Sequence, residues 1–282
     1  MTVVDAHMHV PRLSTVTAAW MQWATEFGRD SGWQEAFGPD GDPVPARLDA
    51  MLAAEGVDTA LLFAEYSPRT TGIQPFEDLL PLAAHNPDRF RLVANVNPEV
   101  HEDPAAEATR QLRLGAVAVK VHPVHGAFRL DSPGLYRVYD LCAGRGVPVI
   151  VHTGGSIFPG SDPDAGDPKM MSQVIEDFPG LSVVLAHGGR GPWYADAARM
   201  ALDAGQVWLD LAGLPPKKLP GYYAGFDLPA LARRWIFGTD WPGMPGVARN
   251  ARAVAGLGLP DDILAGVLGG NATRVYLAGN PS

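Results

Sequence analysis

Two histidines near the N-terminus give the strongest single indication of chemistry in this chain. His7 and His9 are separated by one residue and follow a β-branched, apolar run that is typical of a strand. Side chains alternate along a strand, so both imidazoles point to one face, about 7 Å apart along the chain. Imidazoles placed in this way can bind one divalent ion, and Asp5 would share their face as a hydrogen-bond acceptor one layer deeper.

Polar side chains also end the other predicted strands. His152, His187 and Asp240 are among them, and five of the eight histidines in the chain lie at such positions. The other polar residues at strand ends are Glu65, Asn95, Asn97, Lys120 and His122. A single polar residue at a strand end is common, whereas histidines and an aspartate at several ends favour a shared metal site. This interpretation requires a fold that brings the ends of distant strands together.

Eight short apolar runs supply these ends, and amphipathic segments lie between them. Apolar runs of this kind are typical of parallel strands that are covered on both faces. The predicted strands are residues 2–7, 58–64, 90–96, 116–122, 148–152, 181–187, 207–212 and 235–240. Predicted helices include residues 75–85, 104–114, 132–145, 169–178 and 193–204.

This alternation predicts an α/β fold, a (β/α)8 or TIM barrel that forms one domain over residues 1–282. The active site of such a barrel lies at the C-terminal ends of its strands, where the polar residues gather here. A doubly wound open sheet is the competing architecture. It is disfavoured because no glycine-rich phosphate-binding loop follows the first strand.

The connection between the first two predicted strands is unusually long. Residues 13–48 contain Trp20, Trp23, Phe27, Trp33 and Phe37, followed by a segment rich in glycine and proline. Because this connection follows a strand, it lies over the mouth of the predicted barrel, where it would form a substrate lid or a pocket wall. A packed helical excursion or a subunit contact is the equally weighted alternative.

The composition restricts the class of partner. The 22 basic and 31 acidic residues give a formal net charge of −9, which argues against nucleic acid and anionic membranes as partners. A small anionic substrate is still compatible, because a metal ion reverses the local field. The single cysteine, Cys142, lies in a predicted helix and is expected to be a buried thiol. We find neither a secretion signal nor a membrane-spanning run, so a cytoplasmic location is expected.

Six motifs spread along the chain together resemble the amidohydrolase superfamily. More narrowly, they resemble its amidohydrolase-related branch, which includes the aminocarboxymuconate-semialdehyde decarboxylase-like enzymes. The motifs are residues 5–9, 120–123, 151–154, 185–189, 237–242 and 269–274. They run from the first strand to the last helix, and their combination is specific although no single motif is.

The resemblance implies one divalent ion, usually zinc, held by His7, His9, His152 and Asp240, with His187 beside it. Zinc with an open coordination position lowers the pKa of bound water to about 7 and so provides hydroxide at neutral pH. Asp240 would orient that water or accept its proton, and His187 would polarise a carbonyl or transfer a proton. Manganese is the alternative ion, because imidazole and carboxylate suit both.

Four further residues are candidates for metal bridging or substrate binding: Lys120, His122, His125 and Arg190. In some branches of the superfamily a carboxylated lysine on the fourth strand bridges two metals, and Lys120 ends the fourth run. An unmodified Lys120 would instead bind a substrate carboxylate or pair with an acidic residue. We favour this second reading, with one metal. Arg190 could reach an anionic substrate, or it is a surface arginine that leads a helix.

Two reactions suit this set of residues. The first is hydrolysis of an ester, lactone or amide-type bond in a small organic acid by metal-bound hydroxide. The second is non-oxidative decarboxylation, or the related hydration, of an aromatic or unsaturated carboxylic acid, which the resemblance and the tryptophan-rich segment favour. Both predict a small-molecule substrate, a carboxylate, and the resemblance implies a homodimer. A purely structural zinc site is disfavoured, because such sites normally use four protein ligands and often cysteine.

Overall fold

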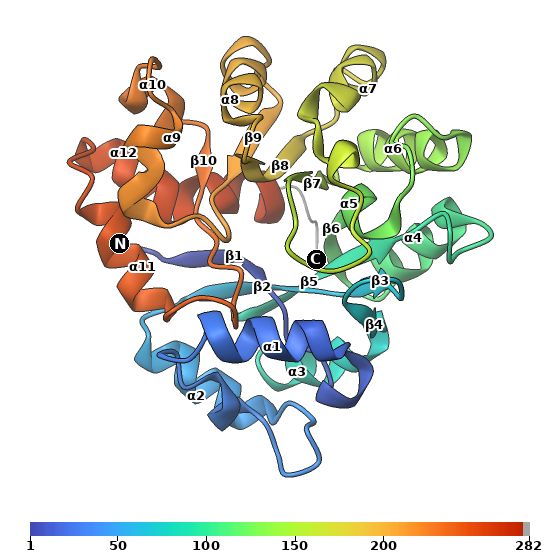
Figure 1. Ribbon diagram of the computed structural model, residues 1–282, viewed down its shortest axis with the longest axis vertical. Coiled ribbons are helices and arrows are strands. Elements are labelled where there is room, and N and C mark those ends of the chain that lie inside the picture. Colours follow the sequence, from blue (N-terminus) through green and yellow to red (C-terminus); the bar gives the residue numbers. More distant parts are fainter. Residues whose placement is uncertain (279–282) are drawn as a thin grey trace.

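The structure is a computed structural model, and it describes residues 1–278. Eight parallel strands form one sheet, and helices surround it (Figure 1). The strands are β1 (Val4–Met8), β2 (Thr59–Phe63), β5 (Phe90–Val96), β6 (Ala116–Val121), β7 (Val149–Gly154), β8 (Val183–Arg190), β9 (Val207–Asp210) and β10 (Trp235–Ile236). Each overlaps one run predicted from the sequence, so the predicted barrel is confirmed.

The sheet closes because the chain after β10 returns alongside β1. The amide of His9 donates to the carbonyl of Trp241 at 2.8 Å, and the amide of Asp240 donates to the carbonyl of His7 at 3.0 Å. These bonds continue the parallel pairing beyond β10, with Met8 opposite Trp241. Closure therefore places Asp240 beside the two histidines of the first strand, although more than 230 positions separate them in the sequence.

Helices surround the barrel, and capping residues in the sequence determine where some of them begin. The side chain of Asp103 caps the helix that begins at Pro104, accepting from the amides of Ala105 and Ala106. The helices are α1 (Ala18–Phe27), α2 (Pro45–Ala54), α3 (Leu80–His85), α4 (Pro104–Arg113), α5 (Pro123–Gly126), α6 (Pro133–Arg145), α7 (Ser172–Asp177), α8 (Tyr194–Asp203), α9 (Leu219–Tyr222), α10 (Leu228–Ala232), α11 (Val247–Ala255) and α12 (Asp261–Ala265). Each predicted helical segment contains one of them.

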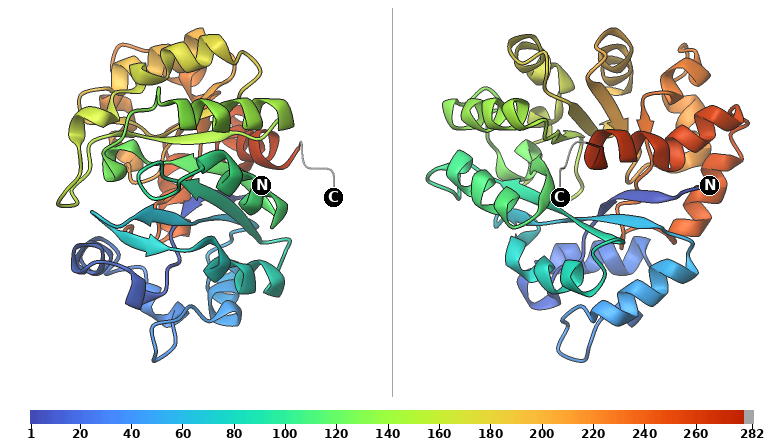
Figure 2. Two further views of the ribbon diagram at one scale, coloured as in Figure 1. Left: turned by 90° about the vertical axis from the view of Figure 1, so that its right-hand side faces the viewer. Right: turned by 180° about the vertical axis from the view of Figure 1, so that it is seen from behind.

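Apolar side chains fill the barrel at the end opposite to the strand-end polar residues. This interior cluster contains Val4, Ala6, Leu61, Phe63, Val93, Ala118, Ile150, Val184, Ala186 and Ile236, among others. Tyr276, from the C-terminal helical segment, joins it, and Figure 2 shows that segment lying across the back of the barrel. The cluster excludes water from that end.

Two further elements bear on the site. A short antiparallel ribbon, β3 (Glu65–Ser67) and β4 (Gly72–Gln74), follows β2 at its C-terminal end. Cys142 is buried in α6, as expected. None of the helices within residues 1–278 has the length and apolar character needed to cross a membrane.

Candidate active site

The C-terminal ends of the strands surround a cavity of about 170 Å³. Most of the predicted polar residues line it: His7, His9, Glu65, His122, His125, His152, His187, Arg190 and Asp240. Asn95 and Asn97 instead bond to the backbone of Tyr66 and are structural. The structure thus brings together side chains that the sequence places on six different segments.

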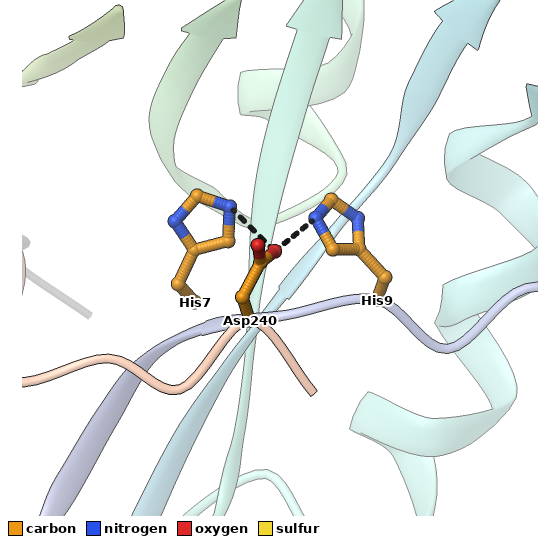
Figure 3. Close-up of side chains that lie close together, drawn as sticks. All are labelled: His7, His9 and Asp240. Atoms are coloured by element: carbon orange, nitrogen blue, oxygen red, sulfur yellow. Dashed lines mark ion pairs between the residues drawn. The ribbon is translucent and has the colours of Figure 1, made fainter. Parts of the chain in front are cut away.

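His7, His9 and Asp240 converge on one wall of this cavity, with both rings directed at the carboxylate (Figure 3). Oδ1 of Asp240 lies 3.3 Å from Nε2 of His9 and 3.8 Å from Nε2 of His7. One donor atom from each of the three residues lies within 4.8 Å of the others, close enough to share a metal ion. The return of the chain from β10 to β1 produces this convergence.

Asp210, the last residue of β9, sets the orientation of the His7 ring. Its Oδ2 lies 2.5 Å from Nδ1 of His7, and both side chains are buried. An ionised Asp210 accepts a hydrogen bond from Nδ1–H of His7, so the proton of the neutral ring stays on Nδ1 and the lone pair of Nε2 faces Asp240. The sequence analysis missed this residue, although an aspartate inside the apolar run 207–212 was a usable signal.

His152 and His187 complete this wall. Neither nitrogen of His152 has a hydrogen-bond partner within the described residues, and the same holds for Nε2 of His7. Nδ1 of His187 donates to the carbonyl of Ala212 at 2.8 Å, so its Nε2 is unprotonated when the ring is neutral. Burial lowers the pKa of His7, His152 and His187 well below the ordinary value. Buried polar atoms without partners are uncommon in folded proteins and point to a ligand.

Irregular backbone turns two of these side chains toward the cavity. His187 has a φ of 63° and Asp240 a φ of 70°, in the left-handed region that residues other than glycine rarely adopt. Ala186 packs in the barrel interior, so a regular strand would turn the next side chain, His187, outward. Strained backbone of this kind costs roughly 1–3 kcal/mol and is concentrated at functional sites.

A bulge in β1 corrects the expected role of Asp5. The register with β2 shifts between Asp5 and Met8. As a result two consecutive residues point into the barrel: Ala6 belongs to the interior cluster, and the ring of His7 stacks on Phe63 in that cluster. Asp5 therefore does not share the face of His7 and His9. Its carboxylate accepts from the amide and hydroxyl of Thr239, at 2.9 and 2.6 Å, and so fixes the segment that carries Asp240.

Two cations lie near the cluster. Nζ of Lys120 is buried without a hydrogen-bond partner, and within residues 1–278 it forms no ion pair with Asp240 or Glu65. Burial lowers the pKa of Lys120 to about 8, although nearby carboxylates oppose the shift. Arg190 lines the cavity and donates to the carbonyl of Gly155 through Nε and Nη2, at 3.1 and 2.8 Å.

The neighbouring wall, where Glu65 lies 3.8 Å from Nδ1 of His9 and the ring of His122 stacks on that of His152, carries a chain of hydrogen bonds. Nδ1 of His125 lies 2.9 Å from Oε1 of Glu65, and Nε2 of His125 lies 2.9 Å from Oγ of Ser156. Burial is the largest single influence on Glu65 and opposes its ionisation, but the hydrogen bonds from His125 and Thr71 and the nearby imidazoles of His125 and His9 together outweigh it and lower the pKa of Glu65 to about 2. Nδ1 of His122 accepts from the amide of His125 at 3.3 Å. Ser156 and Thr71, which also bonds to Glu65, were not identified from the sequence.

Aromatic side chains from α1 form the outer part of the cavity. Trp20, Trp23 and Phe27 line it, whereas Trp33 is buried in the core. A Cβ on Gly243 would lie 2.0 Å from the Trp23 ring, so the segment after β10 packs directly against this ring. The segment 13–48 therefore contributes α1 to the cavity wall, while its alternative role in a subunit contact stays a prediction.

Known structures share this architecture over almost the whole chain. An uncharacterized TIM-barrel protein from Bordetella bronchiseptica is 25% identical with a TM-score of 0.80, and 98% of each chain is covered. A 5-carboxyvanillate decarboxylase from Novosphingobium aromaticivorans, complexed with manganese and 4-hydroxy-3-methoxy-5-nitrobenzoic acid, is 16% identical with a TM-score of 0.64, covering 98% of this chain and 96% of the other. A probable 2-pyrone-4,6-dicarboxylic acid hydrolase from Acinetobacter baumannii, with citric acid bound, is 16% identical with a TM-score of 0.65, covering 98% and 99%.

The family is shown by sequence as well as by fold. No significant match is found among curated proteins. A family model described as Amidohydrolase matches residues 4–277, which is nearly the entire chain. The resemblance seen in the six motifs is thereby confirmed, and candidate metal-binding residues are present. The chain belongs to the amidohydrolase family and is a metal-dependent enzyme of that superfamily.

Proposed function

We propose that the protein hydrolyses an ester, lactone or amide-type bond of a small organic acid in a reaction that depends on a divalent metal ion. One observation carries this proposal. The unpartnered nitrogens of His7 and His152 share the cavity wall with the carboxylate of Asp240.

These residues fit a metal ion. His7, His9, His152 and Asp240 offer three imidazoles and one carboxylate, a donor set that suits zinc or manganese. Asp210 supports this assignment, because it directs the lone pair of His7 Nε2 toward the other donors. When bound, one divalent ion would act as a Lewis acid and lower the pKa of a water molecule.

Asp240 and His187 provide the proton transfers. Burial would raise the pKa of Asp240, but the contacts with His9, His187 and His7 outweigh it and keep the carboxylate ionised at neutral pH. Asp240 can therefore accept a proton from the attacking water. His187, neutral and unprotonated at Nε2, can then take this proton from Asp240 and donate it to the leaving group.

The cations near the site fit a carboxylate on the substrate. Arg190 is held by the Gly155 carbonyl through two of its nitrogens, and its side chain faces the cavity. His122 adds a hydrogen-bond donor, because its Nδ1 accepts a bond and its neutral ring must carry the proton on Nε2. We assign substrate binding to these residues and to an unmodified Lys120.

Non-oxidative decarboxylation of an aromatic acid is the second candidate, and the aromatic wall favours it. Trp20, Trp23 and Phe27 face Phe158 across the mouth, and the rings of Trp23 and Phe158 meet edge to face at 5.7 Å. Flat rings of this kind suit a planar substrate. In this reaction Asp240 or His187 would protonate the carbon that loses carbon dioxide.

Parallel assays on metal-loaded protein separate the two reactions. A panel of esters and lactones of small organic acids is followed by acid release, and a panel of phenolic acids by release of carbon dioxide. We expect acid release that a chelator abolishes and that zinc or manganese restores, with exposed His85→Ala as an unaffected control. Release of carbon dioxide without hydrolysis would move the assignment to a decarboxylase, and protein that binds no divalent ion would contradict both.

The surroundings of the site yield two smaller proposals. We infer that the segment 13–48 acts as a pocket wall, supported by the three aromatic residues that it places in the cavity. We also retain the homodimer implied by family resemblance. A measurement of the mass of the protein in solution tests whether it forms this homodimer, independently of activity.

A further inference from the structure

We propose that Ser156, His125 and Glu65 form a second reactive group in the same cavity: a serine nucleophile with its general base, able to transfer acyl groups without a metal ion. Ser156 and Glu65 have no role in the metal-dependent reaction proposed above. This inference therefore adds an activity to the proposed function and does not depend on it.

The hydrogen bonds run in the order that such chemistry needs. His125 lies 2.9 Å from Ser156 Oγ through Nε2 and 2.9 Å from Glu65 Oε1 through Nδ1. A carboxylate only accepts, so Nδ1 carries the proton and Nε2 is left to accept from the serine hydroxyl. The same order of hydrogen bonds, from nucleophile to base to orienting acid, recurs in serine hydrolases of unrelated folds.

Each member of the group is held in place by a different element. Glu65 also accepts from the hydroxyl of Thr71 at 2.6 Å, which fixes its carboxylate at the start of β3. His125 is buried in the short helix α5. Ser156 Oγ accepts from the amide of Phe158 at 3.2 Å, which fixes its rotamer. The set is thus preorganised in the absence of any ligand.

The group can reach a substrate in the cavity. His125 and Glu65 line the cavity, and so do Ile157 and Phe158, the two residues that follow Ser156. Ser156 itself is half-buried. Arg190 bonds to the carbonyl of the preceding Gly155 and places a guanidinium on the same wall, where it can stabilise an oxyanion.

The reaction balances with an ester and water alone. Ser156 Oγ gives its proton to His125 Nε2 and attacks the ester carbonyl, whose π electrons move onto oxygen. Collapse of this intermediate breaks the bond to the alcohol oxygen, which takes the proton from His125. Water then gives a proton to His125 and attacks the acyl-serine. The Oγ–carbon bond breaks to release the acid, and Oγ takes the proton from His125, which restores both residues.

A cation is the competing explanation for this cluster. Donor atoms of Glu65, His122 and His125 lie within 4.8 Å of one another, as for a metal site. However, both nitrogens of His125 already have partners, and the rings of His122 and His125 stack with their centroids 3.5 Å apart. An ion would break these bonds, whereas the serine–histidine–glutamate arrangement uses each of them.

Covalent labelling of chelator-treated protein tests the proposal without the metal-dependent reaction. We expect a fluorophosphonate probe to modify Ser156, as peptide mass spectrometry would show. His125→Ala should slow labelling by about 10²-fold, the usual contribution of a general base. Ser161→Ala, which removes a hydroxyl from the same loop, should change nothing. A folded protein that leaves Ser156 unmodified, under conditions that label a serine protease, overturns the proposal.

A second variant covers the case in which the loss of the Ser156 hydroxyl disturbs the loop. In Ser156→Cys the introduced thiol lies beside His125, and the only native cysteine, Cys142, is buried. We expect iodoacetamide to alkylate Ser156→Cys at least tenfold faster at pH 6.5 than Ser156→Cys combined with His125→Ala, because a neighbouring imidazole favours the thiolate. Glu65→Gln should remove this advantage. Equal rates in the two cysteine variants contradict the proposal.

Discussion

Two neighbouring walls of the cavity differ in whether their buried polar atoms have hydrogen-bond partners. On the wall of His7, His9 and His152, several nitrogens are buried and have no hydrogen-bond partner within residues 1–278. On the wall of Glu65 and His125, both histidine nitrogens and a carboxylate oxygen are hydrogen-bonded. Buried polar atoms without hydrogen-bond partners destabilise a fold until a ligand binds them. A completed chain of hydrogen bonds is in place before any ligand binds. We therefore assign the ion and the proton transfers of the metal-dependent reaction to the first wall, and the metal-independent acyl transfer to the second.

The largest effect on activity is expected at Asp240, the carboxylate on the same wall as His7, His9 and His152. Asp240→Asn keeps the size of the side chain but removes the group that accepts a proton. We expect kcat for the metal-dependent reaction to fall by about 10²- to 10⁴-fold. Steady-state kinetics measure kcat, and elemental analysis measures the content of divalent ion separately.

Glu65→Gln is the matched change on the neighbouring wall, and it should leave the content of divalent ion unchanged. If Glu65→Gln loses the ion as completely as a ligand variant does, the division between the two walls is wrong.

Asp210 should have the next largest effect, because it acts through His7. Asp210→Asn no longer accepts the Nδ1 proton as an anion, so His7 is oriented less well. We expect metal affinity to fall by about 10- to 100-fold. Competition with a chromogenic chelator measures it, and the exposed Asp203→Asn serves as the control. An unchanged affinity would restrict Asp210 to a structural role.

The histidines of the cavity and Glu65 should lose their contributions to stability in different ranges of pH once the metal is removed. Burial lowers the pKa of His7, His122, His152 and His187 well below 6.5, so the unfolded chain binds more protons than the folded chain in acid. The free energy of unfolding should therefore decrease as the pH falls below about 6.5, by up to about 1.4 kcal/mol per unit for each histidine.

Glu65 contributes in a lower range. Its pKa is lowered from 4.5 to about 2, so the stability it adds is present above pH 4.5 and is lost as the pH falls toward 2. Asp5 and Asp210, whose pKa burial raises to about 7, act in the opposite sense, stabilising the fold at lower pH and offsetting part of the histidine effect. Urea unfolding of chelated protein between pH 3 and 7 tests this, and a flat profile between pH 5 and 6.5 would contradict it.

The smallest effect is expected at the aromatic mouth. Trp23→Leu reduces the flat surface over the substrate without touching the polar walls. We expect KM to rise about three- to tenfold with kcat unchanged, since the lost contact acts equally on substrate and transition state. Trp193→Leu, which lies outside the cavity, is the control. A fall in kcat would show that α1 also shapes the reacting geometry.

The fold and the candidate metal residues were accessible from the sequence for one reason. In a parallel barrel every strand contributes its C-terminal end to the same face, so a polar residue at a strand end is already placed. His7, His9, His152, His187 and Asp240 were found in this way, and all of them line the cavity. Asp210 was missed because it lies inside the predicted strand 207–212 and not at its end.

The sequence by itself therefore determined the strand order, the face of the barrel that carries chemistry and the kinds of donor gathered there. Only the tertiary structure decided which side chains pair. The bond from His7 to Asp210 spans 203 positions, and the bonds from His125 to Glu65 and Ser156 span 60 and 31. The bulge in β1 and the left-handed backbone of His187 also depend on neighbouring strands. His7 and His9 are two imidazoles in the sequence, and the return of the chain from β10 makes them half of a proposed metal site.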